Sequence, residues 1–385
     1  MKVLMIPSWY PTPEDPILGS FYREQAEALA ARGVEMAVAY VNVGSDLRPS
    51  HNGIHAEMVN GVATYRHIRP NLTPGWEKGR CRQRARMLEK LYDRIEKEWG
   101  RPDVVNLRSS LQGYEAVELC ERHRLPLFFM EHSSFVVTEG EESEARRRLH
   151  AVMDRAAVNA CVGTTLYQVM APYRETRLIP DFVDGSRFYP MEVKREEEEP
   201  GTFVFRAMGQ LRPIKGHDTL IRAFAQVKEQ ATRPVRLDIA GTGALRDSLQ
   251  QLIDASGVGD CCRLVGRIPR DKVVYFMNGC DCFVCSSRTE MLSCVLHECA
   301  ACGKPAVATR CGGPQDILTE ESGLLVPVDD SQAMAEAMLT MMETADRYDP
   351  ERIRDSILER FGIDSVCDKL TAACEEAARA GRPGD

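Results

Sequence analysis

No stretch of the 385-residue sequence is apolar over the length needed to cross a membrane, which takes about 20 residues. Met1–Pro7 has only four apolar residues after its Lys, too few for the core of a secretory signal peptide. The sequence has no Asp-x-Asp pair, so a metal held by that motif is not indicated. Its formal net charge of −8 argues against a general nucleic-acid-binding protein. These absences favour a cytoplasmic protein without a bound metal.

Cysteine is abundant, with 14 residues, and in a cytoplasmic protein we expect reduced, small and buried thiols. One spacing imitates a four-cysteine zinc ribbon, with Cys282 and Cys285 followed by Cys299 and Cys302. The pairs of a zinc ribbon usually lie in tight turns. Here the first pair lies in a strand-like run and the second in a helical pattern, so we expect cysteines in place of Ala or Val, not a zinc site.

The length and the order of patterns predict two domains. Apolar runs of strand length alternate with amphipathic segments, which is typical of doubly wound α/β sheets. We expect a Rossmann-like domain over 1–185, a second over 186–350, and a C-terminal helical segment over 351–385 that crosses back to the first. The charged stretch Met191–Pro200, with Glu196–Glu199, is the predicted connector.

The first half contains five predicted strands: Lys2–Pro7, Val34–Val41, Gly61–Ile68, Val104–Leu107 and Leu125–Met130. An irregular polar stretch is expected between the second and the third. Ligands of such sheets bind at the carboxyl ends of the strands. Gly19 follows the first strand, where it either lets a substrate approach the backbone or simply makes a turn. His132 follows the fifth, in the polar cluster Glu131–Ser134.

The most informative stretch lies between the predicted strands Cys282–Ser286 and Pro305–Thr309. Glu290 lies in the turn before a predicted helix, and Glu298 lies two turns into that helix. The backbone N–H groups near Leu292–Val295 are then unpaired donors at a helix N-terminus, which suits an anion. Carboxylates on either side of an anion site suit a ligand with hydroxyls at both ends and phosphates between, which describes a nucleotide sugar.

The pattern Glu290-x7-Glu298, closed by Ala-Cys-Gly-Lys-Pro-Ala-Val-Ala-Thr, resembles the donor-binding motif of glycosyltransferase family 4. The resemblance implies a GT-B fold, in which two Rossmann-like doubly wound domains face each other across a cleft. It also implies a retaining, metal-independent transfer of a hexose-type sugar from a nucleoside-diphosphate sugar, a UDP-sugar more than a GDP-sugar, with no cofactor. It covers about residues 1–365, weakly over 43–100 and strongly over 202–328.

The resemblance assigns the donor to the two glutamates and to the amides between them: Glu290 with Leu292 and Ser293 for the sugar, Cys294 and Val295 for the diphosphate, and Glu298 for the ribose hydroxyls. Many members of the family have Phe-Gly where this sequence has Leu292-Ser293. The family usually has a His at the place of His132, beside the transferred sugar, and a glycine that faces the donor at the place of Gly19. A second place where a His is frequent is occupied by Asn106, and Asp181 stands where Asn is usual.

A glycine-bounded loop after the predicted strand Thr202–Met208 places Lys215 to neutralise a diphosphate. The family pattern there is Gly-Arg-Leu-x3-Lys-Gly, and Gln210 replaces its Arg. That Arg gives a bidentate phosphate contact which Gln cannot reproduce. Arg212 is a candidate to compensate for it.

In the family, the end of the predicted strand Cys262–Ile268 meets the nucleobase, so Arg267 and Ile268 are either donor contacts or ordinary loop residues. The catalytic candidates are His132, Glu290 and Lys215. The leaving diphosphate would be stabilised by Lys215 and the helix amides and could take the acceptor's proton, so no separate base is required.

The acceptor is expected to be a hydroxyl of a saccharide, a lipid-linked or a small molecule. The predicted helix Arg80–Trp99 and the residues before it carry six positive charges beside Trp76: Lys78, Arg80, Arg82, Arg84, Arg86 and Lys90. These charges contact an anionic membrane at its inner face, bind a phosphate-bearing acceptor, or form a solvated helix face. Two alternatives to a transferase stay open: a GT-B nucleotide-sugar epimerase or phosphorylase, and a non-catalytic partner subunit, for which Gln210 is the sequence support.

Overall fold

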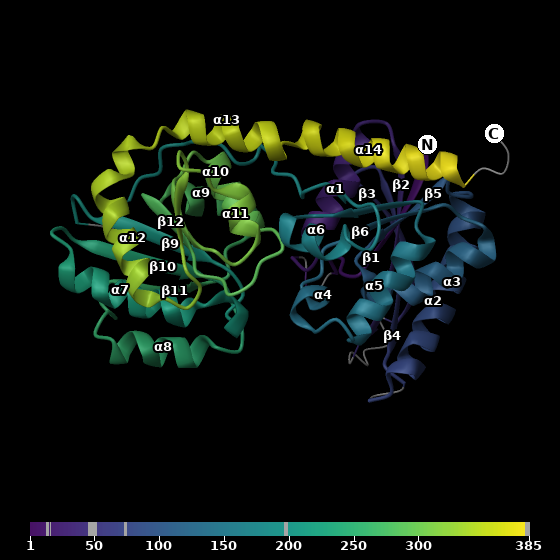
Figure 1. Ribbon diagram of the computed structural model, residues 1–385, viewed down its shortest axis with the longest axis horizontal. Helices are drawn as coiled ribbons and strands as arrows, with labels where there is room; N and C mark the ends of the chain where they lie inside the picture. The colour runs from purple at the N-terminus through teal and green to yellow at the C-terminus, as the bar shows by residue number, and fades with distance from the viewer. Residues whose placement is uncertain (13–14, 16, 45–51, 73–74, 196–198, 382–385) are drawn as a thin grey trace. The chain divides into compact units, whose positions relative to one another are not determined.

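The computed structural model describes residues 1–12, 15, 17–44, 52–72, 75–195 and 199–381 (Figure 1). Residues 196–198 of the predicted connector lie outside them. The chain divides into two compact units, one formed by Met1–Pro180 with the segment from Val366 onward, and the other by Asp181–Ser365. We call these unit 1 and unit 2. The domain boundaries predicted from the sequence were at residues 185 and 350.

Unit 1 is built on an eight-stranded sheet with the strand order β3-β4-β2-β1-β5-β6-β7-β8. Its strands are β1 Lys2–Pro7, β2 Glu35–Gly44, β3 Gly53–Val59, β4 Val62–Pro70, β5 Val104–Arg108, β6 Leu127–Glu131, β7 Val158–Cys161 and β8 Arg177–Leu178. All pairings are parallel except that of β3 with β4. Strands β5, β6 and β7 are buried along their whole length, as in sheets covered on both faces.

Strand β3 corrects the prediction of an irregular polar stretch before β4. It pairs antiparallel with β4 at the edge of the sheet, and most of its side chains are exposed, so it shows no apolar run. Asn60 and Gly61 form the turn between the two strands, both with positive φ, of 46° and 81°. An Asn-Gly pair is a strong hairpin signal because both residues tolerate that conformation, and this signal was present in the sequence.

The helices of unit 1 are α1 Ser20–Ala31, α2 Glu77–Glu98, the 3-10 turn η2 Ser110–Gln112, α3 Gly113–His123, α4 Phe135–Thr138, α5 Glu144–Arg155 and α6 Thr164–Met170. Most of helix α14 (Ile363–Ala380) also belongs to this unit. Its buried side chains include Leu370 and Cys374, and Glu376 pairs with Arg177 of β8 at 2.5 Å. The helical segment predicted over 351–385 is divided at Gly362 into α13 (Pro350–Phe361) and α14.

Unit 2 holds a six-stranded parallel sheet with the order β11-β10-β9-β12-β13-β14. Its strands are β9 Phe203–Met208, β10 Val235–Ala240, β11 Cys262–Gly266, β12 Cys282–Cys285, β13 Ala306–Thr309 and β14 Gly323–Val326. Its helices and 3-10 turns are η3 Pro213–Lys215, α7 His217–Gln230, α8 Arg246–Ala255, η4 Arg270–Lys272, α9 Val273–Asn278, α10 Cys294–Ala301, α11 Gly313–Ile317, α12 Ser331–Thr344, η5 Ala345–Arg347 and α13 Pro350–Phe361.

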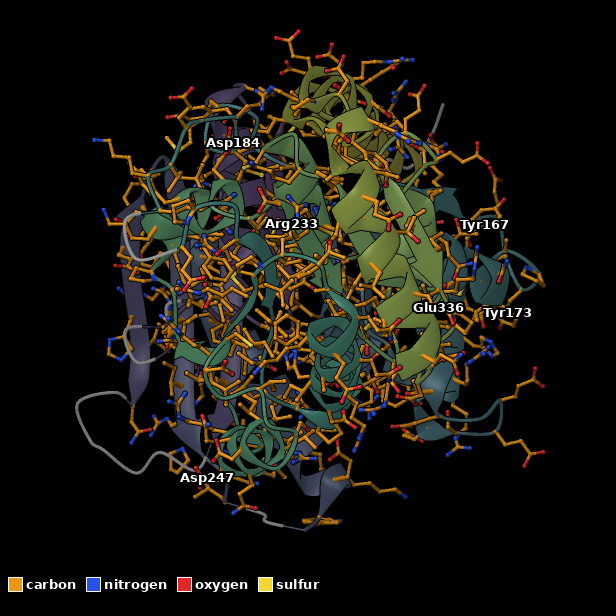
Figure 2. The ribbon with its side chains drawn as sticks, turned by 90° about the vertical axis from the view of Figure 1, so that its left-hand side faces the viewer. Tyr167, Tyr173, Asp184, Arg233, Asp247 and Glu336 are labelled. Atoms are coloured by element: carbon orange, nitrogen blue, oxygen red, sulfur yellow. The ribbon has the colours of Figure 1, made fainter. Side chains whose placement is uncertain are left out.

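One side of the unit 2 sheet is packed by apolar side chains from the strands and from α7, α8 and α12, among them Phe205, Phe224 and Met338. The outer faces of two of these helices are polar, with Asp247 on α8 and Glu336 on α12 exposed (Figure 2). Helix α12 is capped by Asp330, whose side chain accepts from the Ala333 amide at 2.9 Å. The sheet and its covering helices hold the loops at the carboxyl ends of the strands, where the candidate site lies.

Candidate active site

The turn that carries Glu290 is tied to a distant loop through its backbone. The Glu290 amide donates to the Cys311 carbonyl at 3.1 Å, and the Gly313 amide donates to the Glu290 carbonyl at 2.8 Å. A Cβ on Gly313 would lie 2.6 Å from Leu292 Cα, so a residue without a side chain is needed there. The helix α10 begins after this tethered turn, at Cys294, with Ser293 as its N-cap residue.

Glu290 in this turn forms a close ion pair with Lys215, which lies at the end of η3. Lys215 Nζ lies 2.6 Å from Glu290 Oε1, and Ser287 Oγ donates to the same oxygen at 2.7 Å. Burial acts to lower the pKa of Lys215, but the charge of Glu290 and its hydrogen bond outweigh burial, so the pKa is raised. Lys215 is therefore a fixed positive charge at neutral pH, as a phosphate-binding group must be.

The Lys215 loop is held by contacts that the sequence did not reveal. Gly216 has a φ of +61°, and a Cβ there would lie 2.0 Å from the Ser286 carbonyl oxygen. Arg288 donates its backbone amide to Ile214 O at 2.7 Å and its guanidinium to the Pro213 carbonyl. The same guanidinium contacts Asp218 at 3.0 Å and Asp329 at 2.7 Å. Two acidic residues thus hold Arg288 against the loop that carries Lys215.

Glu298 lies on α10 and is almost completely buried, with 6% of its surface exposed. Arg270 Nη1 of η4 donates to Glu298 Oε1, and its guanidinium lies 5.1 Å from the centroid of the Phe188 ring. The sequence singled out Glu298 but missed Arg270, which lies 28 positions away in a polar turn with no motif. A carboxylate and its cation are therefore brought together beside the anion-binding end of the helix.

The first turn of α10 offers the amides of Cys294 and Val295, which have no partner one turn earlier within the helix. Ser293 precedes them as the N-cap residue, with no side-chain capping bond among the described residues, and both Leu292 and Ser293 are buried. Unpaired amides aligned with the helix dipole favour an anion. Unit 2 thus brings together amides that can donate to a phosphate, the cation of Lys215, and the carboxylates of Glu290 and Glu298.

Gln210 and Arg212 are both exposed, and Arg212 Nη1 lies 3.4 Å from Gln210 Oε1. Arg267 and Ile268 follow β11, which ends at Gly266, so they are loop residues and not strand residues as predicted. The Gly266 carbonyl accepts from the Gly241 amide at 2.8 Å, which fixes the start of this loop. The roles of these residues toward a nucleotide stay predictions.

His132 and Gly19 belong to unit 1. Glu131 is fully buried, and its carboxylate accepts the amides of Ser110, His132 and Ser133 at 2.7–2.9 Å. This carboxylate therefore organises the loop after β6 that carries the His132 ring. Gly19 has a φ of +68°, and a Cβ there would lie 2.4 Å from the Trp9 carbonyl oxygen. The turn before α1 alone requires this glycine, so its presence does not by itself indicate a substrate contact.

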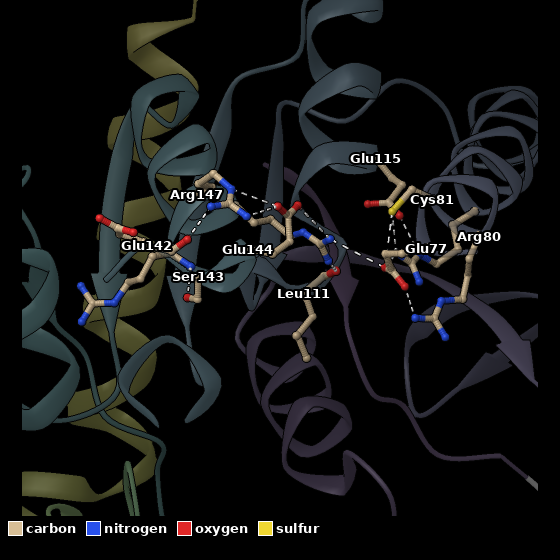
Figure 3. Close-up of polar contacts among 12 residues, drawn as sticks. Glu77, Arg80, Cys81, Leu111, Glu115, Glu142, Ser143, Glu144 and Arg147 are labelled. Carbon is tan, nitrogen blue, oxygen red and sulfur yellow. Dashed lines mark hydrogen bonds and ion pairs between the residues drawn. The ribbon is translucent and has the colours of Figure 1, made fainter. Parts of the chain in front are cut away.

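The basic run on α2 is partly neutralised inside unit 1 (Figure 3). Arg80 pairs with Glu77, and Arg84 pairs with the buried Glu115 at 2.6 Å. The same network continues through Glu144, which pairs with Arg147 at 3.1 Å. The remaining four cations of the run are exposed and recur every four residues: Lys78, Arg82, Arg86 and Lys90. We call these four residues the α2 stripe.

The four cysteines with zinc-ribbon spacing are buried, two on β12, one on α10 and Cys302 just after that helix. No cluster of three or more potential metal ligands occurs in the part of the chain that the structure describes. Among its described helices, none combines the length and the apolar character needed to span a membrane.

Two family models match the sequence, one for each half. The model described as Glycosyltransferase Family 4 matches residues 18–187, and the model described as Glycosyl transferases group 1 matches residues 191–355. This chain is a GT-B glycosyltransferase of the family 4 type. The fold predicted from the sequence, α/β with two Rossmann-like domains, is confirmed.

This glycosyltransferase is 27% identical over 338 residues to a D-inositol 3-phosphate glycosyltransferase of Pseudarthrobacter chlorophenolicus, over 80% of the chain and 77% of the relative. It is 33% identical over 198 residues to the lipopolysaccharide core biosynthesis glycosyltransferase LpsE of Rhizobium meliloti, over 51% of the chain and 56% of the relative. Its fold is similar to that of sucrose-phosphate synthase from Thermosynechococcus elongatus, with a TM-score of 0.81 and 20% identity over 99% and 100% of the two chains. A second neighbour is Anabaena HepE in complex with UDP and glucose, with a TM-score of 0.76 and 18% identity over 97% and 99%.

Proposed function

We propose that this glycosyltransferase moves a hexose-type sugar, with retention of configuration, from a nucleoside-diphosphate sugar to an acceptor hydroxyl. The observation that carries the proposal is the Lys215–Glu290 pair at 2.6 Å beside the first turn of α10. A cation, the amides of a helix N-terminus and a carboxylate then lie close together, as a ligand with a diphosphate and a hydroxylated sugar requires. The HepE neighbour, whose complex contains UDP, supports a UDP-sugar over a GDP-sugar.

In the proposed reaction, Glu290 binds hydroxyls of the donor sugar with the amides of Leu292 and Ser293. The Cys294 and Val295 amides and Lys215 stabilise the negative charge that develops on the leaving diphosphate. The acceptor hydroxyl attacks from the face that the diphosphate leaves, and a phosphate oxygen takes its proton. His132 is proposed to contribute from unit 1, beside the transferred sugar. No metal or further cofactor is needed for these steps.

The proposed acceptor is a hydroxyl of a saccharide, a lipid-linked or a small molecule, and the product belongs to polysaccharide, glycolipid or glycosylated-metabolite synthesis. The named relatives support this range, because they act on an inositol phosphate and in lipopolysaccharide core synthesis. We also propose a peripheral contact of the α2 stripe with an anionic membrane at its inner face.

The test is a thermal-shift panel of UDP, GDP, ADP and their sugars, followed by sugar transfer to candidate acceptors. A nucleotide that binds the folded protein stabilises it by mass action and so raises its melting temperature. At a free nucleotide concentration of 100 times Kd, the gain in stability is about 2.7 kcal/mol. We expect UDP or a UDP-sugar to give the largest shift. No shift with any of these nucleotides would contradict the proposal.

Turnover of the donor without an acceptor would favour the epimerase, and a requirement for inorganic phosphate would favour the phosphorylase. Nucleotide binding with neither transfer nor hydrolysis would favour the partner subunit.

A further inference from the structure

Arg270 is held rigidly although it lies on a short polar turn. Its Nη1 donates to the Glu298 carboxylate, and its guanidinium packs over the ring of Phe188. Phe188 is itself buried, and its carbonyl accepts from Arg354 Nη1 at 2.6 Å. A guanidinium fixed on one side by a ring and on the other by a carboxylate loses the freedom of an ordinary surface arginine.

The surroundings of Cys294 show which charges meet at the start of α10. Burial, and then the Asp181 and Glu298 carboxylates, raise the pKa of the Cys294 thiol well above its usual value. The Arg270 guanidinium acts in the opposite direction. At Cys294, the positive charge of Arg270 therefore acts against the negative charges of two buried carboxylates, at the place where an anionic diphosphate is proposed to bind.

A buried carboxylate that must also accept ligand hydroxyls needs a partner which keeps it charged and oriented. Arg270 contacts Oε1 of Glu298, and each carboxylate oxygen has two acceptor positions. The bond from Arg270 therefore does not by itself exclude ribose hydroxyls from the Glu298 carboxylate. The planar guanidinium also limits rotation of the carboxylate, which sets the direction of its remaining acceptor positions.

We propose that Arg270 is a positioning residue for the nucleotide, because it fixes Glu298 as the acceptor of the ribose hydroxyls and offsets its charge beside the diphosphate. This inference rests on the proposed function. It predicts that Arg270 determines how strongly the protein distinguishes a ribonucleotide from a 2′-deoxyribonucleotide, although Arg270 itself is not required to touch either.

The experiment is calorimetry with UDP and 2′-deoxy-UDP on the parent and on Arg270→Ala. We expect the parent to prefer UDP by about tenfold or more, the size of one charged hydrogen bond. In Arg270→Ala, UDP binding should weaken by about tenfold, and the preference over 2′-deoxy-UDP should fall towards one. The matched control is Lys272→Ala, because Lys272 lies on the same turn and carries the same charge but is exposed and pairs with Asp271 at 3.8 Å. That control should keep the preference of the parent.

Two further variants separate positioning from a general loss of structure. Arg270→Lys keeps the charge and should recover part of the UDP preference. A double variant Arg270→Ala with Glu298→Ala should bind UDP no more weakly than Glu298→Ala alone, because the two residues act as one unit. In steady-state assays, loss of Arg270 should raise KM for the donor more than it lowers kcat, whereas partial unfolding would lower kcat alone.

The outcomes distinguish this inference from the function on which it rests. A parent that binds neither nucleotide would overturn the proposed function, and the role of Arg270 with it. A parent that prefers UDP, with an Arg270→Ala variant that keeps the same preference, would overturn the inference and leave the function in place. Additive losses in the double variant would also overturn it.

Discussion

At the scale of single residues, Lys215 is the group on which the proposed transfer depends most directly. Lys215→Ala removes the fixed cation beside the leaving diphosphate, and we expect turnover to fall by roughly 100- to 1,000-fold, as for loss of a preorganised donor to developing charge. Arg212→Ala tests whether Arg212 has taken over the missing phosphate contact, and Gln210→Ala, at the exposed residue 3.4 Å from the Arg212 guanidinium, should do little.

Sugar release from the donor is the measurement for all three variants. A small effect of Arg212→Ala would mean that Lys215 and the α10 amides suffice for the diphosphate. A marked loss, of roughly 2–3 kcal/mol of barrier, would mean that Arg212 has replaced the missing family arginine. Undiminished activity of Lys215→Ala would contradict the phosphate site proposed here.

Replacing Glu290 and replacing Glu298 should weaken binding of different parts of the donor. Glu298→Ala should weaken binding of the free nucleoside diphosphate by about 1.5–3 kcal/mol, since a carboxylate bound to ribose hydroxyls is a charged acceptor. Glu290→Ala should hardly change that binding, because its proposed partner is the sugar, which the free diphosphate lacks. Calorimetry in which both variants bind the diphosphate like the parent would remove the ribose assignment of Glu298.

The sequence was sufficient to single out Lys215, Glu290 and Glu298, because their signal is local: a fixed spacing, flanking glycines and a strand on each side. It was not sufficient for Arg288 and Arg270, whose partners lie 70 and 28 positions away. Such contacts are made only when strands distant in sequence become neighbours in the sheet. Neither arginine stands in a motif, so nothing in the sequence separated them from solvated residues.

At the scale of secondary-structure elements, the junction between η3 and α7 depends on Gly216. Gly216→Ala should destabilise the protein by about 1–3 kcal/mol, because a side chain there combines an unfavourable positive φ with a collision at the Ser286 carbonyl. Gly257→Ala is the matched control, since Gly257 has a similar φ of +66° but nothing within 4 Å of the added Cβ.

The control variant should lose only the part of the free energy of unfolding that the backbone conformation costs, about 1 kcal/mol. Urea unfolding measures both variants, and donor turnover should fall only in Gly216→Ala, which displaces Lys215. Equal free energies of unfolding in the two variants would show that the contact with Ser286 is unimportant.

The α2 stripe gives a prediction for a whole helix face. Arg82→Glu combined with Arg86→Glu should reduce sedimentation with vesicles that contain an anionic lipid, since each basic residue near such a surface contributes about 1 kcal/mol. Arg246→Glu with Lys272→Glu, two exposed cations of unit 2, is the control with the same change in charge. Equal vesicle binding by the two double variants, or none by the parent, would argue for a solvated face.

Elements whose sequence shows a clear apolar run or period were predicted well. Elements that are fixed by contacts between distant residues were not. Strands β1, β9 and β13, which read as apolar runs, are confirmed within one residue, whereas β2, β6 and β11 differ from the prediction by two or three residues at one end. Strand β3 was not predicted, because an edge strand buries few of its side chains and shows no apolar pattern. The start of α10 was predicted near Leu292–Val295 and lies at Cys294, but the bridge between Glu290 and Gly312, which ties the preceding turn to a loop 22 residues away, could not be predicted.

At the scale of the whole molecule, two buried histidines of unit 2 make stability depend on pH. Burial lowers the pKa of His217 to about 4 and that of His297 to about 3. Below about pH 6.5 the unfolded chain takes up protons that the folded chain cannot, so stability falls as the pH decreases. At pH 5 the loss should be about 2 kcal/mol for each histidine relative to pH 7.5.

Urea unfolding between pH 7.5 and pH 5 tests this expectation. His297→Leu and His217→Gln should each flatten the profile, whereas His55→Gln, at an exposed position of β3, should leave it unchanged. A parent whose free energy of unfolding is the same at both pH values would show that these histidines titrate normally in the folded protein.

Unit 1 takes its sheet from the segment before Asp181 and its helix α14 from the segment after unit 2, with the whole of unit 2 between them in the sequence. On the ribosome, therefore, the sheet of unit 1 is made first but is completed last. At roughly 5–20 residues per second, α14 follows that sheet by on the order of 10–40 s. Unit 2 is a continuous segment and can fold during this delay, while the apolar positions that receive Leu370 and Cys374 are still uncovered. A nascent chain that stalls before α14 would thus have a folded unit 2 joined to a unit 1 with exposed apolar surface. This exposed surface is what a chaperone would have to recognise.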